Sequence, residues 1–187
     1  MVEVTTRFSR ALTTGVLRWL GKLESDIVDL SKKSDGTKVL TDVIYLTIYH
    51  PTHYPQPLPS STLYLIAYGG PAIDWRDGQP VSATVEYRLM KGTVLQADGS
   101  AAVVADAPLL GDIAEALLTW FSQLGKAWPG KSSVYTPANT LEERDFERLC
   151  RLDRAEMRYH AEVSGPDGNA VNAIAYTIVC TWNLGRY

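Results

Sequence analysis

The chain has 187 residues, 45% of them hydrophobic and 21% charged, and its 18 basic and 21 acidic side chains give a formal charge of −3. At roughly 150 residues per domain this length predicts one domain, which buries about 70% of its unfolded surface and needs no disulfide or metal to fold. The acidic balance argues against a dedicated nucleic-acid-binding protein, and no apolar run approaches the ~18 residues of a membrane span. Because Arg7, Arg10 and Arg18 interrupt the start, no signal-peptide core is expected.

Residues 5–31 predict a long amphipathic helix or a broken pair of helices, since their apolar residues recur at steps of three and four. Gly15 and Gly21 favour a bend, and Ser34-Asp35-Gly36 is expected to end the unit. The predicted buried stripe consists of Phe8, Leu12, Val16, Trp19, Leu20, Leu23, Ile27 and Leu30. The early basic residues, which include Lys22, also resemble a mitochondrial presequence; we favour the polar side of a docked helix.

Residues 41–105 predict the main sheet. The segments 41–50 and 62–68 are rich in β-branched and aromatic residues, and Gly69-Gly70-Pro71 is expected to stop the second strand. Asp77-Gly78 predicts a turn, and residues 81–90 alternate cleanly between apolar and polar side chains. Such alternation predicts an antiparallel sheet with one packed face and one wet face.

A turn at 97–100 leads into a predicted short strand at 101–105. Asp106 and Pro108 are then expected to open a helix at 108–124, because an acid caps a helix start and proline is tolerated in the first turn. The predicted buried stripe of this helix is Leu110, Ile113, Leu117, Phe121 and Leu124. Gly125 stands where a C-terminal cap belongs.

Residues 125–139 predict a loop. Thr140 and Glu143 fit a capping box, so 141–151 predicts a short helix, although a strand there fits almost as well. Residues 154–184 predict a C-terminal β-hairpin whose turn is supplied by 165–169.

Each strand of that hairpin has its own row of apolar side chains. The two rows lie on the same face of the hairpin only when the residue numbers of each facing pair add up to an odd number. Cys150 and Cys180 then lie on opposite faces unless a bulge intervenes. Two reduced cysteines are therefore expected, in agreement with a cytoplasmic setting.

Taken together, the predicted fold is α+β: a single domain over 1–187 with a mainly antiparallel sheet, two main helices packed on one face, and a C-terminal β-hairpin.

Gly125-Lys126-Ala127-Trp128-Pro129-Gly130-Lys131-Ser132 satisfies the literal phosphate-loop pattern. In a true phosphate loop a strand enters and a helix leaves, so that backbone amides and the helix N-terminus converge on phosphate. Here a helix is expected to enter, no helical pattern follows, and Pro129 lacks an amide hydrogen. We therefore interpret the segment as a surface loop and keep a nucleotide-binding enzyme that uses Lys131 and Ser132 as the alternative.

His50 and His53 form an HxxH pair that would suit a small metal-binding module. A zinc site needs three or four ligands, and Asp42 is the only further candidate within ten residues. We favour surface imidazoles at a strand end.

The other polar candidates have structural explanations. His160 lies between Glu156 and Glu162 on the polar side of its strand, where cross-strand pairing accounts for it. Asp74 and Asp77 pair two carboxylates in one loop, but aspartates at a turn are the simpler interpretation. No G-x-S-x-G elbow is present. No catalytic, cofactor-binding or metal-binding residue, and no cofactor, is therefore predicted.

The order of the elements is similar to that of tail terminator proteins of long-tailed bacteriophages. The segments that carry this resemblance are the helix 7–23, the strands 63–68 and 81–88 joined by the loop 69–80, the helix 110–124, and the final aromatic-rich strand 176–182. The chain differs by an extra hairpin near 92–105 and by the loop 126–139. Other head–tail neck and completion proteins share this general pattern.

The resemblance implies a non-enzymatic structural protein of the virion, assembled in the host cytoplasm. It implies a homo-oligomeric ring that caps the tail tube and joins it to the head-side connector or stopper protein, with DNA passing through the ring without sequence-specific binding and with no membrane partner. Tyr49, Tyr54, Tyr135 and the terminal Gly185-Arg186-Tyr187 would suit contacts between subunits, because tyrosine offers a large area with a polar tip. Packing of these aromatics on their own domain is the equally simple alternative.

Overall fold

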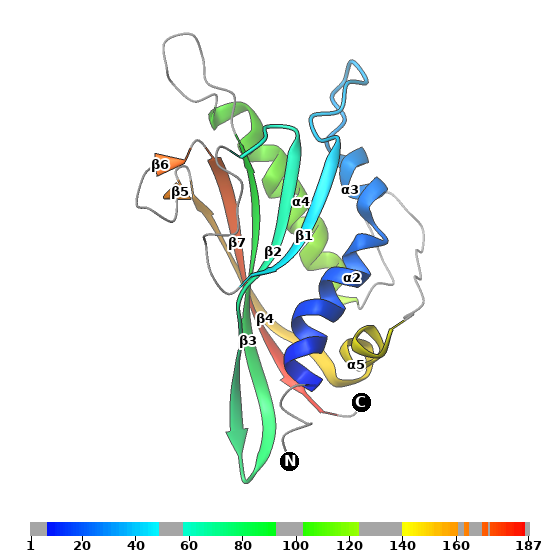
Figure 1. Ribbon diagram of the computed structural model, residues 1–187, viewed down its shortest axis with the longest axis vertical. Helices are drawn as coiled ribbons and strands as arrows, with labels where there is room; N and C mark the ends of the chain where they lie inside the picture. The colour runs from blue at the N-terminus through cyan, green and yellow to red at the C-terminus, as the bar shows by residue number, and fades with distance from the viewer. Residues whose placement is uncertain are drawn as a thin grey trace.

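The computed structural model describes residues 7–48, 58–92, 103–123, 140–160, 163–164, 170–171 and 173–185. It shows a mixed α and β fold in which helices cover one face of a mostly antiparallel sheet (Figure 1).

The N-terminal helical unit is a broken pair. The chain is helical from Arg7, passes through one π-helical turn, η1 (Ala11–Gly15), continues as α2 (Val16–Gly21), and resumes as α3 (Glu24–Leu30). Every residue of the predicted stripe is buried except Leu30, which is half-buried. The turn predicted at Ser34-Asp35-Gly36 is confirmed as well. Gly36 adopts a φ of 87°, which glycine takes without steric cost.

Five strands form the main sheet. They are β1 (Asp42–Ile48), β2 (Thr62–Arg76), β3 (Gln79–Gly92), β4 (Cys150–His160) and β7 (Ala173–Leu184), and they lie side by side in the order β1-β2-β3-β7-β4. A separate two-stranded sheet pairs β5 (Val163–Ser164) with β6 (Ala170–Val171). The β1–β2 pair is parallel and the other pairs are antiparallel. The alternation of side chains could not show this, because it is the same for either strand direction.

The prediction that Gly69-Gly70-Pro71 stops the second strand is wrong. The register shifts between Tyr68 and Ala72, and β2 continues to Arg76. A bulge of this kind accommodates Gly70, whose φ is 72°, and Pro71, which has no amide hydrogen for the ladder. Because the strand continues, the β2–β3 hairpin is much longer than the sequence suggested.

The short strand predicted at 101–105 is also wrong for its described part. Residues from Val103 belong to α4 (Val103–Ser122), so Pro108 lies inside the helix and Asp106 does not cap it. Proline at this sixth position removes one hydrogen bond, to the carbonyl of residue 104. The described part of the predicted stripe is confirmed, because Leu110, Ile113, Leu117 and Phe121 are at most 1% exposed. Leu124 and Gly125 lie outside the described residues.

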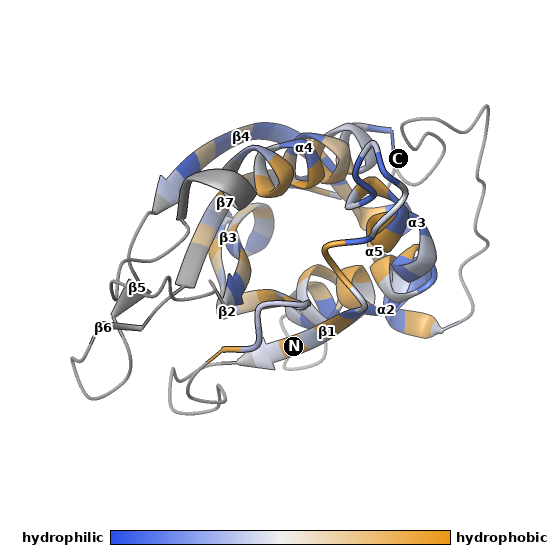
Figure 2. Ribbon diagram, turned by 90° about the horizontal axis from the view of Figure 1, so that it is seen from above, coloured by the Kyte–Doolittle hydropathy of each residue, from blue (hydrophilic) through white to orange (hydrophobic). Residues whose placement is uncertain are grey.

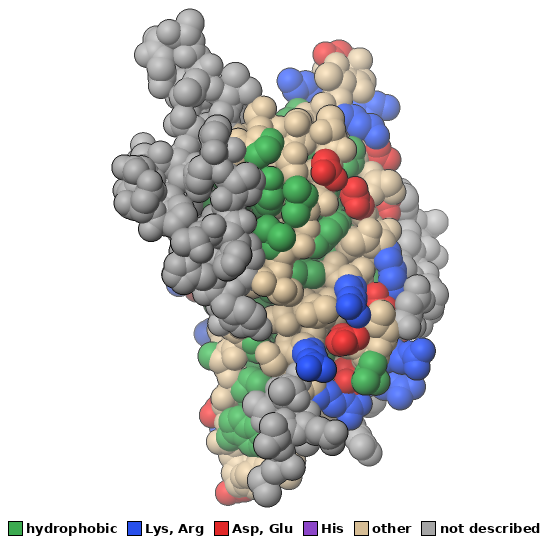
Figure 3. All heavy atoms as spheres, viewed as in Figure 1, with side chains coloured by type: hydrophobic (Ala, Val, Ile, Leu, Met, Phe, Trp, Pro, Cys, Tyr) green, Lys and Arg blue, Asp and Glu red, His purple; other side chains and the backbone are tan. Residues whose placement is uncertain are grey.

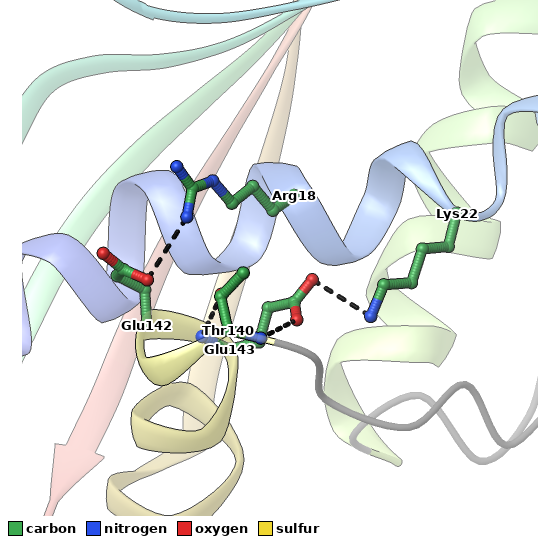
Figure 4. A network of polar contacts seen from close by, with 5 residues as sticks. All are labelled: Arg18, Lys22, Thr140, Glu142 and Glu143. Carbon is green, nitrogen blue, oxygen red and sulfur yellow. Dashed lines mark hydrogen bonds and ion pairs between the residues drawn. The ribbon is translucent and has the colours of Figure 1, made fainter.

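The capping box predicted for the next helix, α5 (Leu141–Leu149), is confirmed. The Glu143 amide donates to the Thr140 hydroxyl at 3.3 Å, and the Thr140 amide donates to the Glu143 carboxylate at 2.8 Å (Figure 4). The alternative of a strand over 141–149 is wrong. Glu143 also pairs with Lys22 at 3.0 Å, which ties α5 to the N-terminal helices.

The C-terminal hairpin is confirmed, as is the odd-sum register of its two strands from Arg154↔Thr181 to His160↔Ala175. A bulge between Leu152 and Arg154 shifts the pairing at the start of β4. That bulge turns Cys150 toward the same core as Cys180. The sequence analysis placed the two cysteines on opposite faces unless a bulge intervened, and one does. Both thiols are free, as predicted, and both are fully buried.

The core lies between the helices and one face of the sheet. Figure 2 shows the sheet curving from β4 round to β1, with the helices along its inner side. Side chains of all five helical elements and of strands β1, β2, β3, β4 and β7 meet in one apolar cluster. Two tyrosine hydroxyls fasten the layers together, because Tyr87 donates to the Leu12 carbonyl at 2.6 Å and Tyr45 donates to the Leu20 carbonyl at 3.2 Å.

Candidate functional site: the arm formed by β2 and β3

The most prominent feature outside the core is the end of the β2–β3 hairpin, which projects past the helices (Figure 1). Strand β1 pairs with β2 only as far as Tyr68, and β7 pairs with β3 only as far as Ser82. Beyond these points β2 and β3 pair with each other. We call residues Ala72–Ser82 the arm and residues Asp74–Pro80 its tip.

The turn of the arm holds the tip in a defined conformation. Asp77 has a φ of 50° and Gly78 a φ of 73°, the left-handed values of both central residues in a two-residue hairpin turn. Such a turn matches the twist of the flanking strands. Asp77 therefore belongs to the turn, as the simpler interpretation of this aspartate predicted.

Trp75 is the chemically distinctive residue of the tip. It lies opposite Pro80 and is 39% exposed. It stands two residues after Ile73, so both point to the same face of β2, and Ile73 packs against the core. The apolar stripe of the strand thus runs past the end of the core into solvent.

The charged neighbours of Trp75 lie on the other face of the arm, because successive side chains of a strand point to opposite faces. Arg76 Nε lies 3.5 Å from an Asp74 carboxylate oxygen there, and both side chains are more than half exposed. An exposed pair of this kind adds little stability. The tip thus presents its indole on one face and an ion pair on the other.

The outer face of the sheet, opposite the helices, has a different character. On β3 and β4, Arg88 pairs with Glu86, Arg158 pairs with Glu156 at 2.8 Å, and the Arg88 guanidinium lies 3.5 Å from the centre of the Tyr68 ring. On β1 and β2 this side of the sheet holds a second apolar cluster, in which Tyr64 and Ile66 are buried and Ile44, Leu46 and Tyr68 are partly buried. Figure 3 shows apolar side chains gathered where β1 and β2 lie in Figure 1. The wet face predicted for residues 82–88 is confirmed.

Burial suppresses the reactivity of the sulfur atoms. It raises the pKa of Cys150 to about 12 and raises that of Cys180 further. The thiolate is the nucleophilic form, so both groups are inert at neutral pH. Burial also raises the pKa of Tyr87, whose hydroxyl is engaged with the first helix.

Several candidates from the sequence are not tested by the structure. His50, His53 and the phosphate-loop-like segment 125–132 lie outside the described residues, as do Tyr49, Tyr54 and Tyr135. The backbone of His160 lies on β4 opposite Ala175, but its side chain is not described. Asp74 and Asp77 are both in the arm.

Within the described segments, no group of three or more His, Cys, Asp or Glu side chains is arranged to hold a metal ion. Among the helices of those segments, none combines the length and the hydropathy that crossing a bilayer requires.

No family model, curated protein or solved structure matches this chain.

The sequence analysis missed the arm as a functional candidate, because it placed Trp75 in an irregular loop. One signal could have revealed it. The two residues Asp77-Gly78 form a strong hairpin signal, and strands can extend directly to such a turn on both sides. That would have put Trp75 on a strand, two residues beyond Ile73.

Proposed function

We propose that this protein is a structural assembly protein of a long-tailed bacteriophage, a tail terminator or a related neck component. It acts as a homo-oligomeric ring that caps the tail tube and contacts the head-side connector. The ring works through the complementarity of its surfaces and leaves the DNA passage free of sequence-specific contacts.

The observation that carries the proposal is the arm. An ordered hairpin that projects beyond the core places its exposed tryptophan where a neighbouring molecule can reach it. It is useful for a subunit, since tryptophan at the centre of an interface contributes more than most residues to binding. The arm therefore supports self-association or contact with a neighbouring tail component.

A second feature supports a role in contacts. On the outer face of β4, Arg158 pairs with Glu156, and both side chains are more than half exposed. Arginine is enriched at protein–protein interfaces relative to the rest of the surface.

Electron microscopy tests the proposal. The purified full chain, mixed with isolated tail tubes that lack their terminal cap, is expected to form rings with a central opening and to bind one end of the tube. The variant Trp75→Ala is the matched control and is expected to form fewer rings. Absence of rings and of bound tube ends for the natural chain would contradict the proposal.

A further inference from the structure

The end of the molecule opposite the arm contains a hollow of about 240 Å³. Its apolar lining comes from Leu30 at the end of α3, from Val39, and from Leu109 on α4. All three side chains are half-buried. Roughly 150 Å³ of apolar cavity holds a benzene ring, so this hollow has room for one indole.

The polar residues of the hollow complement the tip. Lys32, Lys33 and Asp112 line the hollow and are exposed, so its charged groups carry two positive charges and one negative charge. The tip has the opposite balance, with two aspartates and one arginine. The net charge of the hollow is therefore positive and that of the tip is negative.

The hollow is a defined feature of the fold. The amide of Thr37 donates to the Asp35 carboxylate at 2.8 Å, Lys32 and Lys38 form a β-bridge, and Lys38 pairs with Asp29 at 2.6 Å. These contacts close the short hairpin that carries Lys32 and Lys33. The lysines are therefore presented from a fixed turn.

In Figure 1 the turn between β2 and β3 lies at one end of the long axis, and the end of α3, which lines the hollow, lies at the other end. One chain therefore cannot bring its own tip and hollow together. We propose that the arm tip of one copy docks in the hollow of the next copy, with Trp75 against Leu109 and with the turn residue Asp77 facing the lysines. This inference rests on the proposed function, and it names the surface by which the ring closes.

Contact between two different surfaces permits a head-to-tail association. Such an interface leaves one free tip and one free hollow on every incomplete assembly, and it produces a ring when the rotation between copies closes. Two copies related by a two-fold axis would instead exchange their tips and form a closed dimer. The ring of the proposed function therefore requires the head-to-tail arrangement and an assembly of more than two subunits.

Complementation between two variants tests the inference. The tip variant Trp75→Ser keeps an intact hollow, and the hollow variant Lys32→Glu/Lys33→Glu keeps an intact tip. Their masses are measured by light scattering, alone and mixed one to one. Tyr159→Ser is the matched control, because Tyr159 is 41% exposed on β4 and belongs neither to the tip nor to the lining of the hollow.

The expected result is an oligomer for the natural chain and for Tyr159→Ser, monomers for each variant alone, and heterodimers for the mixture, since only one productive interface can then form. Unfolding midpoints close to that of the natural chain establish that the variants are folded. If both variants assemble like the natural chain, the docking is wrong and the proposed function stands. If only one variant loses assembly, or the mixture stays monomeric, the docking is also wrong. If the natural chain itself is monomeric, both proposals fail.

Covalent capture gives a second measurement that does not depend on weakened assembly. The double variant Gln79→Cys/Asp112→Cys keeps Trp75 and both lysines, and it places one thiol in the tip and one at the hollow. It is expected to form a ladder of disulfide-linked chains on mild oxidation. The native thiols do not interfere, because both are buried. Intramolecular products or uncrosslinked chains from an assembled sample would overturn the docking.

Discussion

Trp120 and Trp75 carry the same indole side chain into opposite surroundings. Trp120, on α4, is fully buried, and its ring centre lies 5.6 Å from that of Trp19 and 5.5 Å from that of Phe121. Trp75 stands on the arm, 39% exposed, beyond the reach of the helices.

The difference separates two tasks within one chain. Aromatic rings that meet edge to face in a closed core contribute packing energy beyond the area they bury. A tryptophan on a projecting hairpin contributes little to the stability of its own chain, because much of its ring stays exposed. That exposed apolar surface is available for burial against a partner. Stability resides in the helix-covered half of the sheet, and association resides in the arm.

The largest effect that sharpens this comparison is expected from Trp120→Ala. Removing a fully buried aromatic side chain costs about 3–5 kcal/mol of the free energy of unfolding. Trp75→Ala is the matched control and should cost less than about 1 kcal/mol, since its ring is partly in solvent. Denaturant unfolding of both variants checks this, and equal losses would show that the arm is part of the core.

Gly15→Ala is expected to have the next largest effect. A methyl group at Gly15 would lie 2.5 Å from the carbonyl oxygen of Glu142, so η1 and α5 would have to separate, at a cost of about 1–3 kcal/mol. Gly21→Ala is the control, because its nearest neighbour would be Tyr45 at 3.9 Å and the change should be neutral or slightly stabilising. Thermal unfolding distinguishes the two, and a loss of stability at both positions alike would count against the close approach of η1 and α5.

Alkaline pH should weaken the core and leave the arm alone. The pKa of both thiols is higher in the folded protein than in the unfolded chain, where it is about 8.5. Their contribution to the free energy of unfolding is therefore complete below that pH and is lost as the pH rises toward 12. At pH 9.5 each thiol is expected to reduce the free energy of unfolding by about 1 kcal/mol relative to pH 7. Tyr87 adds to the loss at higher pH, because its pKa is raised too.

Denaturant unfolding at both pH values measures this loss. Cys150→Ala is expected to remove about half of the thiol contribution. An unchanged pH dependence in that variant would show that this thiol does not cause it.

The smallest effect concerns the capping box. Thr140→Ala removes the hydroxyl that accepts from the Glu143 amide and should cost about 1 kcal/mol. Thr140→Ser keeps the acceptor and should be close to neutral. If the alanine and serine variants unfold at the same denaturant concentration, the cap does not stabilise α5.

The sequence predicted most of the core and little of the arm, for physical reasons. Stripes such as Leu12, Val16 and Trp19 recur with the helical period, and that recurrence is visible along the chain. The capping box could be predicted because it depends on two residues three apart. Both signals are local.

The misses depend on partners that are distant in the sequence. Gly69-Gly70-Pro71 normally stops a strand, but pairing of Ala72 with Thr84 carries β2 onward. The β-branched residues at 103 and 104 favour a strand, but they begin α4, whose later turns pack against the core. Likewise the hollow joins residues from two helices and a turn, and no single segment shows it.

The mass of the full chain in solution, measured by light scattering over a wide range of concentrations, tests the central claim most directly. If the arm closes a ring of subunits, the mass approaches a fixed multiple of 20.6 kDa greater than two and remains there as the concentration rises. A mass of 20.6 kDa at every concentration would contradict the account.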